Sequence, residues 1–214
     1  MKGMKTEVLI EMLARGAGAA PRAVAARRLA PVIALGLLAS GLLARLVVGP
    51  LPSAAFQTPA PWIKLAYALV LAGAAAVLTA RLARPIARLR APQTAVVLVV
   101  CAMALVGAVV LMGTPEEQRW QAVLGQTWVV CPWLLMGFSL PALAGILWAV
   151  RGLAPTQLPQ AGFACGLLAG ATGAAGYALA CPESSATFVA IWYTAGMLLT
   201  ALLGRALGPR VLRW

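Results

Sequence analysis

Long apolar runs separated by short polar connections make up most of this chain. Each run has about twenty residues, which is enough for a helix to cross ~30 Å of hydrocarbon. The pattern predicts six membrane-spanning helices, at about residues 29–48, 62–82, 94–113, 127–150, 160–180 and 186–203. We therefore expect an all-α fold, a six-helix transmembrane bundle over residues 29–214, preceded by a separate short segment, residues 1–28.

The segment before the first apolar run has its own helical periodicity. Leu9, Met12 and Leu13 share one face of a predicted helix, with Val8 at the edge of that face, and glutamates lie opposite. A helix of about eleven residues is marginal alone in water, because nucleation is costly. Its apolar face therefore needs a cover, which could be a partner protein, the membrane surface or the rest of this chain.

The distribution of charge predicts the orientation in the membrane. The chain has 17 Lys and Arg against 5 acidic residues, and a net charge of +12. Six of the basic residues precede the first span, four follow the second, one follows the fourth and three follow the sixth; the remaining three are Arg45, Lys64 and Arg119. Because cytoplasmic segments carry the excess of Lys and Arg, we predict that both termini are cytoplasmic.

The positive charge lies beside predicted spans rather than over one soluble domain, so the lipid bilayer is the expected neighbour and direct nucleic-acid binding is not expected. We expect Arg45 and Lys64, which fall near the ends of their spans, to extend toward the lipid headgroups. The chain has no His, which excludes catalysis and metal ligation by that side chain. No carboxylate falls well inside a predicted span, so we expect neither an enzyme nor an ion-coupled transporter, and no cofactor.

The four cysteines fall at different predicted depths. Cys101 and Cys165 lie within spans and are expected to be small buried apolar residues. Cys131 and Cys181 each precede a proline near the predicted outer surface, where a thiol can meet solvent, oxidants and soft metal ions. The pair could form a disulfide if the fourth and fifth spans meet there, or could join Glu183 at a metal site, or could be placed there incidentally.

The fifth predicted span has a glycine every three or four residues. These positions are Gly162, Gly166, Gly170, Gly173 and Gly176. Such a row leaves a groove in which another helix can approach closely. We expect this groove to hold the sixth or the fourth span, in preference to a second copy of the chain.

Several motifs resemble the NrsF family. They are Cys131-Pro132, Ser139-Leu140-Pro141, Cys181-Pro182-Glu183 followed by residues 188–193, and the C-terminal residues 203–214. Members of that family are six-helix inner-membrane anti-sigma factors that restrain an extracytoplasmic-function sigma factor of the SigF type. The resemblance implies that Cys131 and Cys181 sense metal or oxidative stress. It also implies that the cytoplasmic N-terminal segment, with Val8, Leu9, Met12 and Leu13 as its apolar face, holds the sigma factor.

A membrane thiol oxidoreductase coupled to quinone is the alternative function. Cysteines that face outward would suit such chemistry, but these enzymes usually have a C-x-x-C pair, and this sequence has none. Bound quinone in the purified protein would favour the enzyme, whereas co-purification of a sigma factor would favour the regulator.

Overall fold

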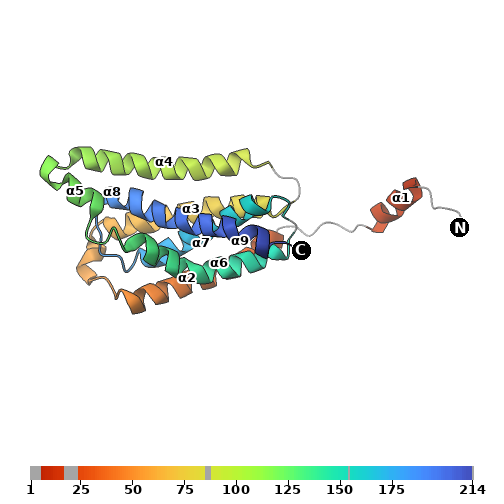
Figure 1. The fold of residues 1–214 in the computed structure, drawn as a ribbon, viewed down its shortest axis with the longest axis horizontal. Coiled ribbons are helices and arrows are strands. Elements are labelled where there is room, and N and C mark those ends of the chain that lie inside the picture. Colours follow the sequence, from red (N-terminus) through yellow and green to blue (C-terminus); the bar gives the residue numbers. More distant parts are fainter. Residues whose placement is uncertain (1–5, 17–23, 85–87, 154, 214) are drawn as a thin grey trace.

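The structure is a computed structural model that describes residues 6–16, 24–84, 88–153 and 155–213, and within these ranges it is helical, with no β-strand (Figure 1). The elements are α1 (Thr6–Gly16), α2 (Val24–Val47), the 3₁₀ helix η1 (Ser53–Gln57), α3 (Ala60–Leu82), α4 (Arg90–Gly113), α5 (Glu116–Leu124), α6 (Cys131–Arg151), α7 (Leu158–Tyr177), α8 (Ala186–Phe188), the π-helix η2 (Val189–Tyr193) and α9 (Thr194–Val211). The last three follow one another without a break, as one helical stretch.

Five helical stretches of the described chain are long and apolar enough to cross a membrane: α2, α3, α4, α6 and the continuous stretch Ala186–Val211. They coincide with five of the six predicted spans, which confirms an all-helical protein with several candidate membrane spans. Helix α7 occupies the position of the remaining span, but its glycine-rich sequence is not among the five. The count of six spans and the cytoplasmic placement of the termini therefore stay predictions.

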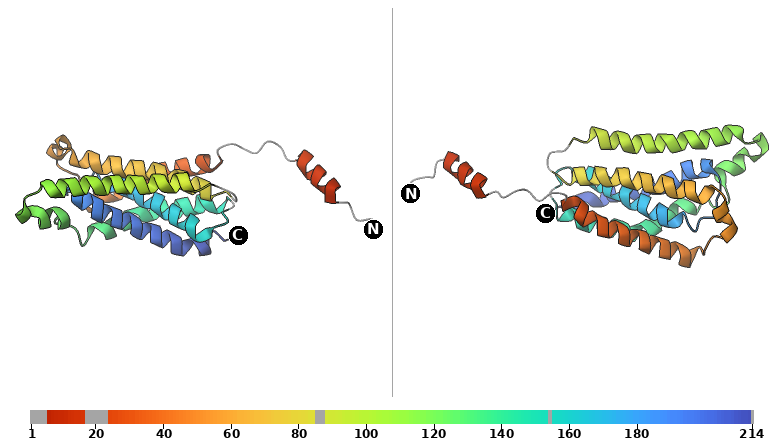
Figure 2. Two further views of the ribbon diagram at one scale, coloured as in Figure 1. Left: turned by 90° about the horizontal axis from the view of Figure 1, so that it is seen from above. Right: turned by 180° about the vertical axis from the view of Figure 1, so that it is seen from behind.

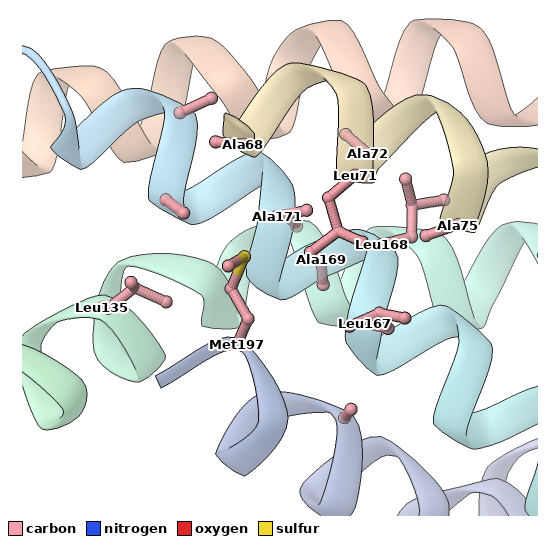
Figure 3. Packing of buried hydrophobic residues seen from close by; sticks show 14 of the residues in the cluster. Ala68, Leu71, Ala72, Ala75, Leu135, Leu167, Leu168, Ala169, Ala171 and Met197 are labelled. Atoms are coloured by element: carbon pink, nitrogen blue, oxygen red, sulfur yellow. The ribbon is translucent and has the colours of Figure 1, made fainter. Parts of the chain in front are cut away.

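Helix α7 lies at the centre of the bundle and contacts α2, α3, α6 and α9 (Figures 1 and 2). Nearly all of its residues are buried. In Figure 3, Leu168 and Ala171 of this helix lie among apolar side chains of its neighbours, including Leu71 of α3 and Met197 of α9. Because α7 faces protein on every side, it does not need the large apolar side chains that a lipid-facing helix carries.

The glycines of α7 allow this close approach, and they confirm the predicted packing inside the chain. A Cβ atom at Gly162 would lie 2.8 Å from Cα of Gly208, and one at Gly166 would lie 2.7 Å from Cα of Ala201, both on α9. Further along, Gly173 faces Ser139 of α6, and Gly176 faces Ser40 and Gly41 of α2. The groove therefore holds three neighbouring helices in turn.

The bundle has two different ends. One end holds η1, α5, the start of α6 and the connection between α7 and α8, whereas the start of α2 and the C-terminal end of α9 share the other end (Figure 1). Arg81 and Arg151, in the last turns of α3 and α6, lie at that other end, together with Arg90 at the start of α4. The two Cys-Pro motifs and this arginine-rich end therefore lie at opposite ends of the bundle.

Some predicted boundaries and environments were wrong. The fourth span begins at Cys131 rather than at residue 127, and the sixth continues to Val211 rather than ending at 203. The connection after α4 contains a short helix, α5, that the hydrophobic pattern did not predict. Cys101 is exposed on α4, because α4 lies at the edge of the bundle and packs on few helices, whereas Cys165 is buried in α7 as expected.

The predicted N-terminal helix is present as α1. Its Val8 and Met12 side chains are 46% and 61% exposed, and the figure shows the helix away from the bundle (Figure 1). Leu9 and Leu13 belong to the same helix, but their side chains lie outside the described part of the structure, as does the segment 17–23 between α1 and α2, which includes Arg22.

We predict that Gly166→Ala destabilises the protein by about 1–3 kcal/mol, because the added methyl group must displace the backbone of α9. Gly137→Ala in α6 is the matched control, since nothing lies within 4 Å of a Cβ atom there. The control should be neutral or stabilising by about 0.5–1 kcal/mol, because Ala favours helix over Gly. Denaturant unfolding followed by circular dichroism in detergent micelles measures both. Equal stability of the two variants would contradict the packing argument.

Candidate functional site

The two Cys-Pro motifs meet at the end of the bundle that holds α5. Cys131 is the first residue of α6, and its amide donates to the Thr127 carbonyl oxygen at 2.8 Å. Pro132 falls in the first turn of the helix, where its missing N–H costs nothing. Cys181 lies just beyond α7, and its amide donates to the Tyr177 carbonyl oxygen at 3.0 Å. Backbone hydrogen bonds therefore fix both cysteines beside helix ends.

The Cys131 and Cys181 thiols are hydrogen-bonded to each other, and both are free and completely buried. The fourth and fifth predicted spans thus meet at this end, as a disulfide would require. The prediction that these thiols meet solvent was wrong, because the connection that follows α7 and a wall of aromatic rings cover them.

Three aromatic side chains form this wall. The Phe138 and Tyr177 ring centroids lie 5.6 Å apart, and the Tyr177 ring stacks on Tyr193 at 5.7 Å. Both tyrosine hydroxyls lie beside the thiols. The Tyr193 hydroxyl is buried, and among the described residues it has no hydrogen-bond partner of ordinary geometry. Tyr193 is in the π-helix η2, an irregularity that is frequent at functional sites.

Lys64 of α3 adds a positive charge to the cluster. Its side chain is 1% exposed, and its Nζ donates to the Cys181 carbonyl oxygen at 2.7 Å and to the Glu183 carbonyl oxygen at 2.9 Å. The prediction that Lys64 extends to the headgroups was wrong, because the connection after α7 covers the start of α3 and offers carbonyl oxygens in place of water. Within the described chain, no carboxylate forms an ion pair with this ammonium.

The surroundings of Cys181 favour its thiolate. The hydrogen bond from the Cys131 thiol and, more weakly, the Lys64 ammonium lower the pKa of the Cys181 thiol to about 6, although burial acts in the opposite direction. Because the thiolate is the nucleophilic form, this lowering of the pKa favours a nucleophilic Cys181 in spite of its burial. This cluster can therefore carry out thiol chemistry.

The Glu183 carboxylate is engaged elsewhere. Its Oε1 accepts hydrogen bonds from the amides of Gln126 and Thr127 at 2.8 and 2.9 Å, and from the Thr127 hydroxyl at 2.8 Å. Gly125 begins this turn with a φ of +57°, and a Cβ atom there would lie 2.7 Å from the Phe188 ring. Glu183 thus holds the turn that precedes α6. No group of three or more His, Cys, Asp or Glu side chains in the described chain could hold a metal ion.

The sequence analysis missed Lys64, Tyr177 and Tyr193 as members of this cluster. One signal for Lys64 was available: it is the only Lys after residue 5, in a chain that otherwise uses Arg. A single Lys inside an apolar run indicates a site where a compact ammonium group is needed. The two tyrosines gave no such signal, since aromatic residues are common near the ends of membrane spans.

Further hydrogen bonds attach the short helices to this end. Ser185 Oγ donates to the Ala122 carbonyl oxygen of α5 at 2.7 Å, and Trp192 Nε1 donates to that of Val123 at 2.9 Å. Thr187 Oγ1 donates to the Gly107 carbonyl oxygen of α4 at 2.8 Å. The stretch that follows Cys181 therefore connects the thiols to α4 and α5.

Comparisons with known proteins give a consistent result. The family model described as "NrsF: Negative regulator of sigma F" matches residues 13–214. A "Probable anti-sigma-F factor NrsF" of Azospira oryzae is 40% identical over 213 residues, which is 99% of this chain and 100% of that protein. An "Anti-sigma-F factor NrsF" of Caulobacter vibrioides is 37% identical over 214 residues, with 99% and 100% coverage. No solved structure matches this chain.

We predict that Glu183→Ala destabilises the protein by about 1–3 kcal/mol, because the Gln126 and Thr127 donors lose their acceptor. Glu183→Gln keeps a carbonyl oxygen as acceptor and should cost less. Glu117→Ala on the exposed surface of α5 is the control and should change the free energy of unfolding by less than about 0.5 kcal/mol. Thermal unfolding in detergent ranks the three variants. Equal losses for Glu183→Ala and Glu117→Ala would contradict the anchoring role.

Proposed function

Because this chain belongs to the NrsF family of negative regulators of sigma F, we propose that it is a membrane anti-sigma factor for an extracytoplasmic-function sigma factor of that type. The observation that carries the proposal is the 37–40% identity to two anti-sigma-F factors over their whole lengths. The chain is accordingly a regulatory protein and not an enzyme, which disfavours the quinone-coupled oxidoreductase.

The partner-binding element in this proposal is α1. Its exposed apolar residues include Val8, Ile10 and Met12, the last two about 60% exposed. An amphipathic helix of this kind can lay its apolar face in a groove of the sigma factor, and Leu9 and Leu13 would complete that face. The family model begins at residue 13, but both relatives align with 99% of the chain, so the N-terminal segment has a counterpart in them.

The proposed location is the bacterial inner membrane, with α1 in the cytoplasm and the two cysteines at the periplasmic side. Five candidate spans support a membrane protein. The arginines of α3, α4 and α6 lie at the end of the bundle from which the chain continues toward α1, as the positive-inside rule requires of a cytoplasmic surface.

The proposed signal is oxidation of the Cys131 and Cys181 thiols to a disulfide. The two thiols give up two electrons and two protons to a peroxide, which is reduced to water and an alcohol or to two waters. We favour oxidation over metal binding, because the Glu183 carboxylate is held by the turn before α6 and supplies no further ligand beside the thiols. The disulfide must change the affinity for the sigma factor, since a signal without differential affinity switches nothing.

We expect Leu9→Asp combined with Met12→Asp to release the sigma factor from the membrane, with at least a tenfold loss of affinity, because two carboxylates would have to be buried in the groove. Retention of a tagged sigma factor in the membrane fraction measures the loss. Glu7→Gln, on the opposite face of α1, is the control and should retain the sigma factor. Unchanged retention by the double variant would reject α1 as the binding element.

The second test concerns the thiols. Cys131→Ser and Cys181→Ser should each keep the sigma factor bound but abolish its release by peroxide, because a disulfide needs both sulfur atoms. Cys101→Ser and Cys165→Ser are matched controls that should respond normally, since neither belongs to the cluster. Transcription from a sigma-dependent promoter after peroxide treatment gives the answer. A normal response in the Cys131 and Cys181 variants would leave these thiols with a structural role only.

A further inference from the structure

Lys64 presents a buried positive charge, and no carboxylate of the described residues forms an ion pair with it. The carbonyl oxygens of Cys181 and Glu183 solvate its ammonium group, but they carry no net charge. An unpaired buried charge is costly, so buried ammonium groups usually have a counter-ion. A negative charge close to Nζ of Lys64 would therefore offset the cost of burying this ammonium.

Two elements besides α3 supply the titratable groups that act on this ammonium. They are Cys131 of α6, and Cys181 and Glu183 of the connection that follows α7. Tyr177 and Tyr193 lie beside the two thiols. The Glu183 carboxylate binds the turn at Gln126 and Thr127, and it acts on the ammonium less strongly than either thiol. Phenols are ordinarily neutral at physiological pH, which leaves the thiols. Of the two, Cys181 accepts the hydrogen bond from the other thiol and interacts most strongly with Lys64.

We propose that Lys64 is the counter-ion of a Cys181 thiolate in the reduced protein, and that it thereby makes Cys181 the thiol that reacts first and Cys131 the thiol that resolves the product. This inference rests on the proposed thiol sensing and adds a positioning residue to it. Lys64 holds the Cys181 backbone through the carbonyl oxygen and the Cys181 sulfur through its charge.

The order of reaction follows from this pairing. The Cys181 thiolate attacks one oxygen of a peroxide, the O–O bond breaks, and a hydroxide or alkoxide leaves, which gives a sulfenic acid on Cys181. The Cys131 sulfur then attacks the Cys181 sulfur, the S–O bond breaks, and the departing hydroxide takes the Cys131 proton to form water. The product is a Cys131–Cys181 disulfide, which has no charge.

Disulfide formation therefore removes the counter-ion of Lys64. The ammonium group must then lose its proton or change its position, and in either case its hold on the connection after α7 changes. Lys64 lies near the start of α3, whose last turn contains Arg81 at the opposite end of the bundle. The loss of one buried negative charge therefore changes the contacts of Lys64 on α3, a helix that reaches the arginine-rich end.

The test uses the purified full-length protein with Cys101→Ser and Cys165→Ser, so that only the two cluster thiols react. A small uncharged alkylating reagent is added at a series of pH values, and mass spectrometry measures the labelling rate of each cysteine. At pH 7 we expect Cys181 to react at least about tenfold faster than Cys131. Lys64→Met should lower the Cys181 rate by about tenfold and shift its pH profile upward, whereas Lys64→Arg, which keeps the charge, should preserve most of the rate.

Faster labelling of Cys131 than of Cys181, or a Cys181 profile unaffected by Lys64→Met, would overturn the proposal. A thermal-unfolding cycle with Lys64→Met, Cys181→Ser and the double variant tests the same pair by a second measurement. Each single change leaves one partner unsatisfied, so the double variant should lose less stability than the two single losses added together. Additive losses would also overturn it.

These measurements need no sigma factor, so they separate the two proposals. Loss of the peroxide response in the cysteine variants together with a Lys64-independent Cys181 profile would keep thiol sensing and reject the ion pair. A Lys64-dependent Cys181 profile together with a normal peroxide response in the cysteine variants would keep the ion pair and reject thiol sensing.

Discussion

The close approach of α7 to its neighbours is the constraint on which the rest of the structure depends. Between helices in lipid there is little hydrophobic driving force, so association relies on intimate packing and interhelical hydrogen bonds. Gly162 and Gly166 bring α7 against α9, and Gly173 brings it against α6. Because α7 is enclosed in this way, its C-terminal end has a fixed place beside the starts of α3 and α6. Cys181, Lys64 and Cys131 are the residues that meet there.

Two polar anchors then complete this end of the bundle. Lys64 holds the connection after α7 through two carbonyl oxygens, and Glu183 of that connection holds the turn before α6 through its carboxylate. Each anchor supplies hydrogen-bond partners to polar groups that are buried away from water. These hydrogen bonds offset much of the free-energy cost of burying the groups. The thiols are therefore enclosed by backbone that cannot move away from them without breaking charged hydrogen bonds.

The sequence predicted five of the candidate spans and the glycine groove, because these follow from local periodicity and residue size. It did not predict the burial of Lys64 or the exposure of Cys101. An apolar run has the same appearance whether a given face meets lipid or protein, and only the tertiary arrangement decides which. α4 lies at the edge, so Cys101 faces outward. Lys64 is buried because a connection more than a hundred residues later folds over it.

In the proposed function, a signal at the thiols has to cross the bundle to reach the opposite end, and the packing limits how it can do so. The neighbouring backbones lie close to the glycines of α7, and close-packed interiors transmit strain rather than absorb it. Two helices begin at the cluster and end among arginines: α3, from Lys64 to Arg81, and α6, from Cys131 to Arg151. Disulfide formation would change the charge balance at Lys64 on α3 and the covalent bonding of Cys131 on α6, so both helices would be affected at the same end. Rigid-body displacement of these helices along the glycine groove is therefore the motion that this architecture permits.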